Sequence, residues 1–203
     1  MDKYQARYLK HQERKRVLLS GKFDSVKVDK PDFSEVFLRL VGQRQSQRFF
    51  SAEKISKKQL DYIKNVITNT PSSCNRQAIQ IKIVKNIEEK KKLEELLVGG
   101  VGWISGADVI LLLLADMSAY KSPAEVKFMP FLDAGFIGMS VYYASEALGL
   151  GSCFVNPNIR EKDQKDFDKL FGKGYRFCGA CVIGNYSKRA LKIKKTGSIF
   201  LRG

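Results

Sequence analysis

The stretch VILLLLA, residues 109–115, sets the fold class of this 203-residue chain. Seven consecutive apolar residues without polar alternation are typical of a strand buried on both faces. Strand-like and helix-like patterns are interspersed on either side of it. We therefore expect an α+β protein, layered as in α/β folds, with one central mixed sheet flanked by helices.

The remaining elements are read from hydrophobic periodicity and from turn and cap residues. Ser56 is a candidate cap for an amphipathic helix that places Leu60 and Ile63 on one face. Further strands are expected at 79–85, 152–155 and 176–184, and helices over 2–19, 33–42, 56–70, 87–97, 129–151 and 159–171.

The segment 129–151, MPFLDAGFIGMSVYYASEALGLG, is apolar nearly all round. A helix of this kind must be buried, either inside the core or against another subunit. Ala134, Gly135 and Gly138 are small enough to let a second helix approach closely. The sequence thus favours a long buried helix at a dimer interface, and an internal core helix is the alternative.

Charge and composition limit the classes of partner. The formal net charge is +15, but acids are interleaved in runs such as EEKKKLEE (88–95), which favours a solvated surface over a nucleic-acid-binding patch. Neither a signal peptide nor a membrane-spanning run is recognisable, and we expect a cytoplasmic protein with no membrane partner. Residues 1–40 are expected to form an N-terminal helical extension, and residues 41–203 the main domain with a basic C-terminal tail.

The cysteines and the single histidine exclude several kinds of site. The four cysteines are expected to be reduced thiols, and the pair in CGAC (178–181) to be structural, with the two thiols on opposite faces of a strand. One histidine cannot build a multi-histidine zinc site, and no metal site is expected. Trp103 either anchors a glycine-rich loop on the core or covers a substrate pocket.

Two polar stretches carry the candidate site. RQSQR (44–48) spaces Arg44, Ser46 and Arg48 two residues apart, so that an extended chain would align two guanidinium groups and a hydroxyl for a phosphate. TPSSCNRQ (70–77) leads into a predicted strand. If it is extended, Ser73, Asn75 and Gln77 project to one side and offer amide donors and acceptors to the edge of a heterocycle.

The order and spacing of these stretches resemble the FMN-dependent nitroreductase family. RQSQRFFS looks like that family's Arg-x-Ser-x-Arg motif, TPSSCNRQ is similar to its Pro-Ser-x-x-Asn-x-Gln motif, and LDAGFIGMSVYYASEALGLGSC resembles its central helix with a Gly-Leu-Gly exit. The resemblance covers roughly residues 40–195 and implies the nitroreductase-like fold and a homodimer whose two flavins receive contacts from both chains.

The resemblance also implies a set of FMN contacts. Residues of the first motif would hold the phosphate and ribityl chain, and Arg48 would stabilise the negative charge that reduction leaves near N1 and O2 of the flavin. The second motif would bind the flavin's polar edge, and Asn156 would donate its backbone N–H to N5. The implied cofactor-binding residues are Arg44, Gln45, Ser46, Arg48, Ser73, Asn75, Gln77, Asn156, Lys192 and Lys194, with Lys195 as an alternative in the tail.

The sequence departs from the family pattern in two places near the implied flavin contacts. Pro157, which has no N–H, stands where a glycine often follows the N5 donor, so one flavin contact could be missing or replaced. RQAIQ (76–80) replaces the Gln-Pro-Trp of many relatives, which leaves the local turn open.

The implied activity is that of an FMN-dependent oxidoreductase. NADH or NADPH would reduce the flavin at N5, and an electron-poor acceptor such as a quinone or nitroaromatic would take the electrons. The flavin carries this chemistry, so no catalytic side chain is assigned. The alternatives are a non-catalytic or degenerate flavin-binding protein and a basic nucleic-acid-binding scaffold.

Overall fold

The computed structural model describes residues 5–6, 8–10, 12–13, 16 and 31–189. The chain divides into two compact units, Met1–Glu35 and Val36–Gly203, and the candidate site belongs to the second. The helix expected over 2–19 falls largely outside the described residues. The domain boundary expected at residue 40 stays a prediction.

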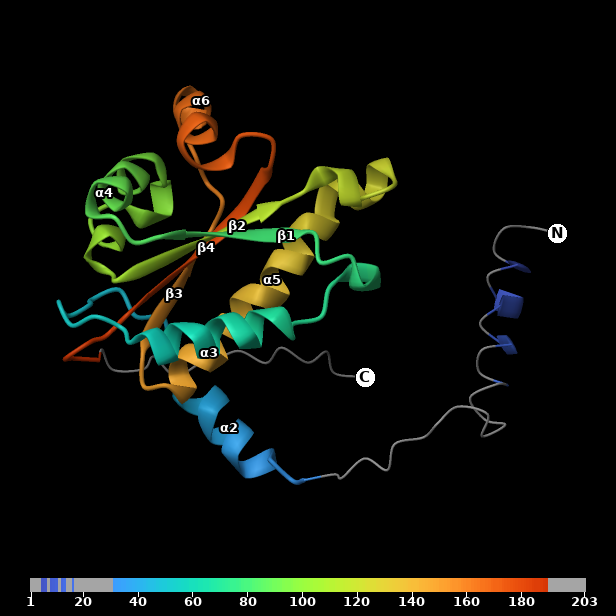
Figure 1. Cartoon of the computed structure of the whole chain (residues 1–203), viewed down its shortest axis with the longest axis horizontal. Helices are drawn as coiled ribbons and strands as arrows, with labels where there is room; N and C mark the ends of the chain where they lie inside the picture. Colours follow the sequence, from blue (N-terminus) through green and yellow to red (C-terminus); the bar gives the residue numbers. More distant parts are fainter. Residues whose placement is uncertain (1–4, 7, 11, 14–15, 17–30, 190–203) are drawn as a thin grey trace, which may run out of the picture. The chain divides into compact units, whose positions relative to one another are not determined.

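One sheet forms the centre of the second unit, with strand order β1-β2-β4-β3 (Figure 1). Its strands are β1 (Ile79–Val84), β2 (Val109–Ala115), β3 (Gly151–Val155) and β4 (Arg176–Gly184). The α+β class is confirmed, but every neighbouring pair of these strands is antiparallel, so the sheet is not mixed. Strand β2 begins at the same end of the sheet at which β1 ends, because the segment between them does not cross back over the sheet. A parallel contact occurs only in the isolated bridge between Ser46 and Ser152 among the described residues.

Helices α2 (Ser34–Gln43), α3 (Lys57–Thr68) and α4 (Ile87–Leu96) begin and end within two residues of their predicted bounds. Ser56 caps α3 as expected, in a capping box with Gln59. The segment expected as one helix over 159–171 is instead a 3₁₀ turn, the short helix α6 and a π-helical turn, Asp168–Gly172. The α-helices of the described part are α2 (Ser34–Gln43), α3 (Lys57–Thr68), α4 (Ile87–Leu96), α5 (Pro123–Ala147) and α6 (Gln164–Phe167).

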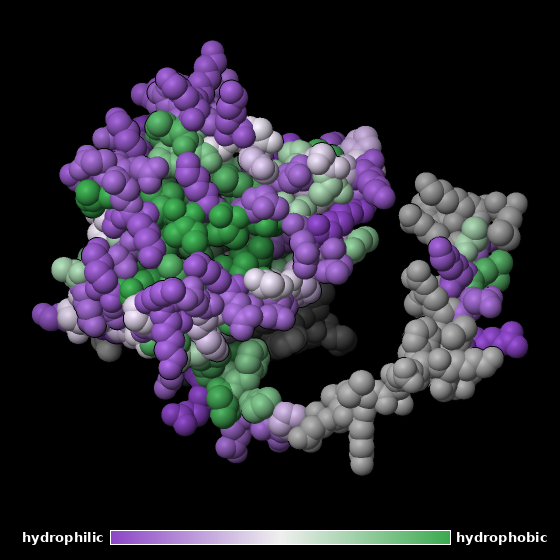
Figure 2. All heavy atoms as spheres, in the orientation of Figure 1, coloured by the Kyte–Doolittle hydropathy of each residue, from purple (hydrophilic) through white to green (hydrophobic). Residues whose placement is uncertain are grey.

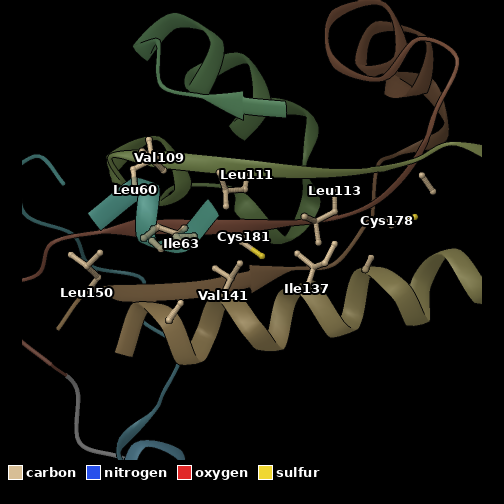
Figure 3. Packing of buried hydrophobic residues seen from close by; sticks show 14 of the residues in the cluster. Leu60, Ile63, Val109, Leu111, Leu113, Ile137, Val141, Leu150, Cys178 and Cys181 are labelled. Atoms are coloured by element: carbon tan, nitrogen blue, oxygen red, sulfur yellow. The ribbon is translucent and has the colours of Figure 1, made fainter. Parts of the chain in front are cut away.

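The central strand β2 separates two hydrophobic clusters. Leu111 and Leu113 face one cluster, which α3 and α5 cover (Figure 3). Ile110 and Leu112 face the other cluster, to which α4 and α6 contribute. All seven residues of β2 are buried, as the unbroken apolar run predicted. Successive side chains of a strand point to opposite faces, so this strand alone requires a layer of helices on each side.

The β1 edge of the sheet is incompletely covered. Hydrophobic residues gather near the centre of the face in Figure 2, where Figure 1 places β1 and β2. Ile83 of β1 keeps 37% of its surface exposed. Lys82 on the same strand donates a hydrogen bond from Nζ to the carbonyl of Leu170, at 2.8 Å. A charged residue on an edge strand discourages pairing with another chain.

The long helix α5 begins six residues earlier than predicted and ends four residues earlier. Ser122 caps its N-terminus by accepting a hydrogen bond from the N–H of Glu125, and Pro123 occupies the first helical turn, where a missing N–H is tolerated. Its last residue is Ala147, and Gly149 then adopts a φ of +70°, which ends the helix and turns the chain toward β3. No helix of the described residues is long and apolar enough to cross a bilayer.

Of the three small residues expected to admit a second helix, two instead pack inside the chain. Ala134 is fully buried in the cluster beneath the helix. A Cβ at Gly138 would stand 2.7 Å from the ring of Phe154 on β3. Gly135 alone faces outward, with no other side chain or neighbouring element within 4 Å of a Cβ placed there. Close approach of a second helix at all three positions is therefore excluded, because β3 and the core already occupy two of them.

A bulge in β4 changes which way its cysteines point. The register shifts between Leu113 and Leu114 of β2, so that Cys178 and Gly179 together oppose Leu113. Cys178 and Cys181 consequently lie in the same cluster, on the α5 side of the sheet (Figure 3). The expectation that the two thiols face opposite ways is wrong, because the extra residue shifts the alternation by one.

We predict that Gly179→Ala lowers the free energy of unfolding by about 1–3 kcal/mol. Gly179 has a φ of +135°, and a Cβ there would stand 2.3 Å from Phe154 and 3.1 Å from the carbonyl oxygen of Val155. Urea unfolding monitored by circular dichroism measures the change. Gly106→Ala is the control, because no atom lies within 4 Å of a Cβ at that position. Equal stability of the two variants would contradict the close packing at the bulge.

Candidate functional site

The first motif segment is held against α5 and β3. Ser46 bridges Ser152, and the N–H of Gln47 donates to the carbonyl of Ser152 at 2.9 Å. Side chains alternate here as the sequence predicted: Ser46 is exposed, whereas Gln47 is 2% exposed. Gln47 points inward and donates from Nε2 to the carbonyls of Phe49 and Lys188.

Tyr142 of α5 is the centre of the contacts made by this segment. Its hydroxyl lies 3.1 Å from Ser46 Oγ and accepts a hydrogen bond from the N–H of Phe154 at 2.7 Å. The guanidinium carbon of Arg44 lies 4.7 Å from the centre of its ring. Burial raises the pKa of Tyr142, so the hydroxyl stays neutral near pH 7. Tyr142 therefore contacts both the guanidinium group of Arg44 and the hydroxyl of Ser46, two groups of the predicted phosphate site. Gln45, between them in the sequence, is half-buried.

Arg48 and Asn156 meet at a small hollow of about 240 Å³. Trp103, Cys153 and Phe154 also line it. The guanidinium carbon of Arg48 lies 5.8 Å from the centre of the Trp103 ring. The structure thus brings together the arginine predicted for the pyrimidine side of a flavin and the residue predicted to donate an N–H to N5.

Trp103 anchors the glycine-rich loop, and its side chain also lines the hollow. Its Nε1 donates to the carbonyl of Gly99 at 3.0 Å, and its ring stacks near that of Phe50 with 6.5 Å between centres. These contacts anchor the glycine-rich loop. The exposed part of the same side chain forms a wall of the hollow beside Arg48.

The second motif segment is a tight turn and is not extended. Ser73–Asn75 forms a 3₁₀ turn, and β1 begins only at Ile79. Asn75 and Gln77 have φ values of +52° and +51°. The strand-like alternation expected for Ser73, Asn75 and Gln77 is therefore wrong, because left-handed residues break the pleat on which it depends.

The two motifs contact α5 at two separate places. Arg44 and Ser46 contact Tyr142, whereas the N–H of Ser73 donates to Asp133 Oδ1 at 2.7 Å. Nine residues separate Asp133 from Tyr142, about 14 Å along a helix axis. The two points of contact are therefore well separated, and one helix holds both motifs. The tail residues Lys192, Lys194 and Lys195 lie outside the described residues.

Pro157 lies in a tight turn directly after β3. The N–H of Asn158 donates to the carbonyl of Asn156 at 2.8 Å, which closes the turn around the proline. Asn156 itself is exposed. The effect of Pro157 on a flavin contact stays a prediction.

Sequence reasoning did not identify Asp133 and Tyr142 as site residues. Asp133 is 1% exposed, and its Oδ2 accepts a hydrogen bond from the Tyr120 hydroxyl at 3.0 Å. Burial is the main cause that raises the pKa of Tyr120, and the hydrogen bond to Asp133 raises it further. Asp133 is the only charged residue of α5 between Lys127 and Glu146, and this was the available signal, since a buried charge requires partners.

The four cysteines of the chain all lie in the described part of the structure. All four are free thiols, and no group of three or more potential ligands comes together there. Burial raises the pKa of Cys178 to about 11. The structural role predicted for the CGAC pair agrees with its burial.

Comparison with known proteins places the chain in the nitroreductase family. The profile of the Nitroreductase family matches residues 41–102 and 97–185. The FMN reductase [NAD(P)H] of Bacillus subtilis (strain 168) is 31% identical over 174 residues, which is 78% of this chain and 69% of the relative. The chain belongs to the nitroreductase family.

Solved structures agree with this assignment. B. megaterium NfrA2 superposes with a TM-score of 0.68 at 27% identity, over 78% of this chain and 69% of that chain. An FMN-dependent nitroreductase from Clostridium difficile R20291 gives a TM-score of 0.66 at 20% identity, over 76% of this chain and 90% of the other, and supports the fold. The nitroreductase-like fold expected from the motifs is thereby confirmed.

We predict that Tyr142→Phe lowers the free energy of unfolding by about 1–3 kcal/mol, because the part-buried N–H of Phe154 loses its acceptor. Chemical denaturation of the purified variant measures this loss. Tyr143→Phe is the matched control and keeps the edge-to-face ring contact with Phe37, at 5.4 Å between centres. We expect this control to stay within about 0.5 kcal/mol of the parent protein. Equal losses in the two variants would refute the central role of the Tyr142 hydroxyl.

Proposed function

We propose that this chain is an FMN-dependent NAD(P)H oxidoreductase that passes electrons to an electron-poor small molecule such as a quinone or a nitroaromatic. Family membership and the 31% identity to an FMN reductase [NAD(P)H] support the cofactor and the electron donor. The observation that carries the proposal is the contact of Arg44 and Ser46 with Tyr142, together with that of Arg48 with Trp103.

The residues of the first motif fit the phosphate end of FMN. The Ser46 hydroxyl is exposed, and Arg44 carries a fixed positive charge beside it. No carboxylate is paired with Arg44 or Arg48 among the ion pairs of the described residues. Both cations thus remain able to bind an anion. Gln45 is included in this group as a ribityl contact, by its position in the motif.

The residues around the hollow fit the ring system of a flavin. FMN, when bound, supplies the capacity to accept and donate hydride. Arg48 would place its charge near the pyrimidine side, and Asn156 would offer its backbone N–H from the opposite wall. Trp103 and Phe154 would exclude water with apolar surface. Asn75 and Gln77 would bind the polar edge through their side-chain amides.

The C-terminal segment starts beside the phosphate end of the site. The carbonyl of Lys188 accepts the 2.8 Å hydrogen bond from Gln47, and Arg189 pairs with Glu146 of α5 through Nη1 and Nη2. These contacts hold Lys188 and Arg189, the last residues described before the basic tail, beside the first motif and α5. We include Lys192 and Lys194 as phosphate-binding residues on this ground.

We expect the purified protein to show flavin absorption bands, or to acquire them on incubation with FMN. NADH or NADPH added without oxygen should bleach these bands, and the faster donor identifies the preferred nicotinamide. A protein that binds FMN but is bleached by neither donor would be a silent flavin binder. A protein that binds no FMN would refute the flavin function, and a steep salt dependence of nucleic-acid binding would then favour the basic scaffold.

A comparison of two ligands tests the phosphate contact in the same preparation. Arg44→Ala should weaken FMN binding at least tenfold and change riboflavin binding less than twofold, because only FMN carries the phosphate. Arg160→Ala, which removes an exposed arginine paired with Asp163, is the control and should change neither. Equal weakening of both ligands would place Arg44 away from the phosphate.

We further propose a homodimer built around the outer face of α5. Phe128, Leu132, Phe136 and Met139 repeat at helical spacing and remain 41–50% exposed in the single chain. A contiguous exposed apolar face marks an interaction surface. Assembly of two copies would cover it, in agreement with the dimer that the family resemblance implies. Placement of the protein in the cytoplasm remains a prediction from the sequence.

Phe136→Glu should convert the dimer into monomers at micromolar concentration, since a charge would be buried in the apolar interface. Sedimentation velocity measures the distribution of species. Tyr62→Glu is the control, because Tyr62 is 46% exposed on α3. A monomeric parent protein, or a Phe136→Glu variant that remains dimeric, would refute this interface.

A further inference from the structure

The turn that carries the second motif adopts an unfavourable backbone. Cys74, Asn75 and Gln77 have φ values of +53°, +52° and +51°. Non-glycine residues rarely occupy this region, and of these three only asparagine is enriched there. Such a conformation persists only where the surrounding structure holds it. The contacts of this turn therefore determine where Asn75 and Gln77 point.

Hydrogen bonds inside the turn close it but do not fix its place in the molecule. The Ser72 hydroxyl accepts from the N–H of Gln77 at 2.9 Å, and the Ser72 carbonyl accepts from the N–H of Asn75 at 2.9 Å. Both bonds join residues of the same turn. An attachment to another element is needed to orient it.

Helix α5 provides that attachment at two points. Asp133 Oδ1 accepts the 2.7 Å hydrogen bond from the N–H of Ser73. Two turns earlier along the helix, Glu125 Oε1 lies 3.2 Å from Nη2 of Arg76. Tyr120 fixes the carboxylate of Asp133 from the other side, through the 3.0 Å bond to Oδ2. Asp133 is thus an almost fully buried carboxylate with a neutral donor on each oxygen.

Burial of a carboxylate is costly unless hydrogen bonds offset the loss of water, as the donors from Ser73 and Tyr120 do here. Charge-assisted hydrogen bonds from a carboxylate to a backbone N–H are short and strong. The bond to Ser73 N–H acts on the backbone at the start of the turn, directly before Cys74. Asp133 also lines a hollow of about 220 Å³ together with Ser72 and Gln77. The carboxylate and Gln77 of the second motif therefore line the same hollow.

We propose that Asp133 is a positioning residue for the flavin site, which it serves by holding the N–H of Ser73 so that Asn75 and Gln77 present their amides to the polar edge of FMN. This inference rests on the proposed function. Asp133 does not touch the flavin and acts through the backbone of the turn. Loss of its bond to Ser73 should release the turn from its strained conformation and misplace both amides.

The serine itself offers a matched pair of variants. Ser73→Pro removes the N–H that Asp133 accepts, whereas Ser73→Ala keeps it and removes the hydroxyl. Ser72 has φ −137° and ψ 161°, the extended conformation required before a proline, and Ser73 opens a 3₁₀ turn, where proline is tolerated. The difference between the two variants therefore reports the N–H contact and not the side chain.

The dissociation constant of FMN, measured by quenching of its fluorescence, should rise at least tenfold in Ser73→Pro relative to Ser73→Ala. Asp133→Asn should weaken binding by a similar factor relative to the parent protein. Asp108→Asn is the control, because Asp108 accepts a backbone N–H from Ile55 at 2.9 Å, at the opposite end of α3 from the turn. We expect this control to stay within threefold of the parent protein.

The midpoint potential of bound FMN, measured at saturating FMN, separates positioning from general stability. It should become more negative in Ser73→Pro and Asp133→Asn, because fewer donors reach the polar edge of the reduced flavin. It should not move in Asp108→Asn. If Asp133→Asn fails to fold by circular dichroism, the two Ser73 variants decide the question.

The outcomes distinguish the inference from the function on which it rests. A parent protein that binds no FMN would overturn both. A parent protein that binds FMN, together with equal affinities and potentials in Ser73→Pro and Ser73→Ala, would overturn the positioning role alone. Equal losses of affinity in Asp108→Asn and Asp133→Asn would also overturn it, because the effect would then follow from destabilisation.

Discussion

Burial of β2 on both faces is the constraint on which the rest of the structure depends. Its alternating side chains reach two separate clusters, so the sheet must have helices on each side. Full burial of each Leu or Ile of the strand contributes roughly 1.5–3 kcal/mol. The layer containing α5 forms because this strand requires a cover. The functional site follows from the same requirement, because α5 carries the side chains that hold both motifs.

Helix α5 acts as a rigid scaffold between the two motif segments. Asp133 contacts the turn of the second motif, and Tyr142 contacts the first. A helix holds two such contacts at a fixed separation because every backbone hydrogen bond lies within it. Residues on rigid elements are positioned more precisely than residues on loops. The loops that carry Arg44 and Asn75 can therefore be irregular without losing their mutual arrangement.

The two faces of α5 explain why its sequence is apolar nearly all round. One face, with Ile137 and Val141, packs on the sheet (Figure 3). The other, with Phe136 and Met139, remains exposed in the single chain. Periodicity disappears when a helix has apolar partners on both sides. The structure of one chain accounts for the first face, and the proposed dimer accounts for the second.

The sequence by itself determined most of the elements and the family to which the chain belongs. The unbroken run at 109–115, the cap at Ser56 and the residue types of the two motifs depend on neighbours close in the chain, and such local patterns are readable. The order of strands, the bulge that turns Cys178 and Cys181 to one side, and the left-handed turn at Asn75 were decided only by the tertiary structure. The contacts responsible, such as that of Asp133 with Ser73, join residues sixty positions apart. Local preference opposes a left-handed Gln77, and it is stabilised by the bond of its N–H to Ser72 together with the attachment of the turn to α5.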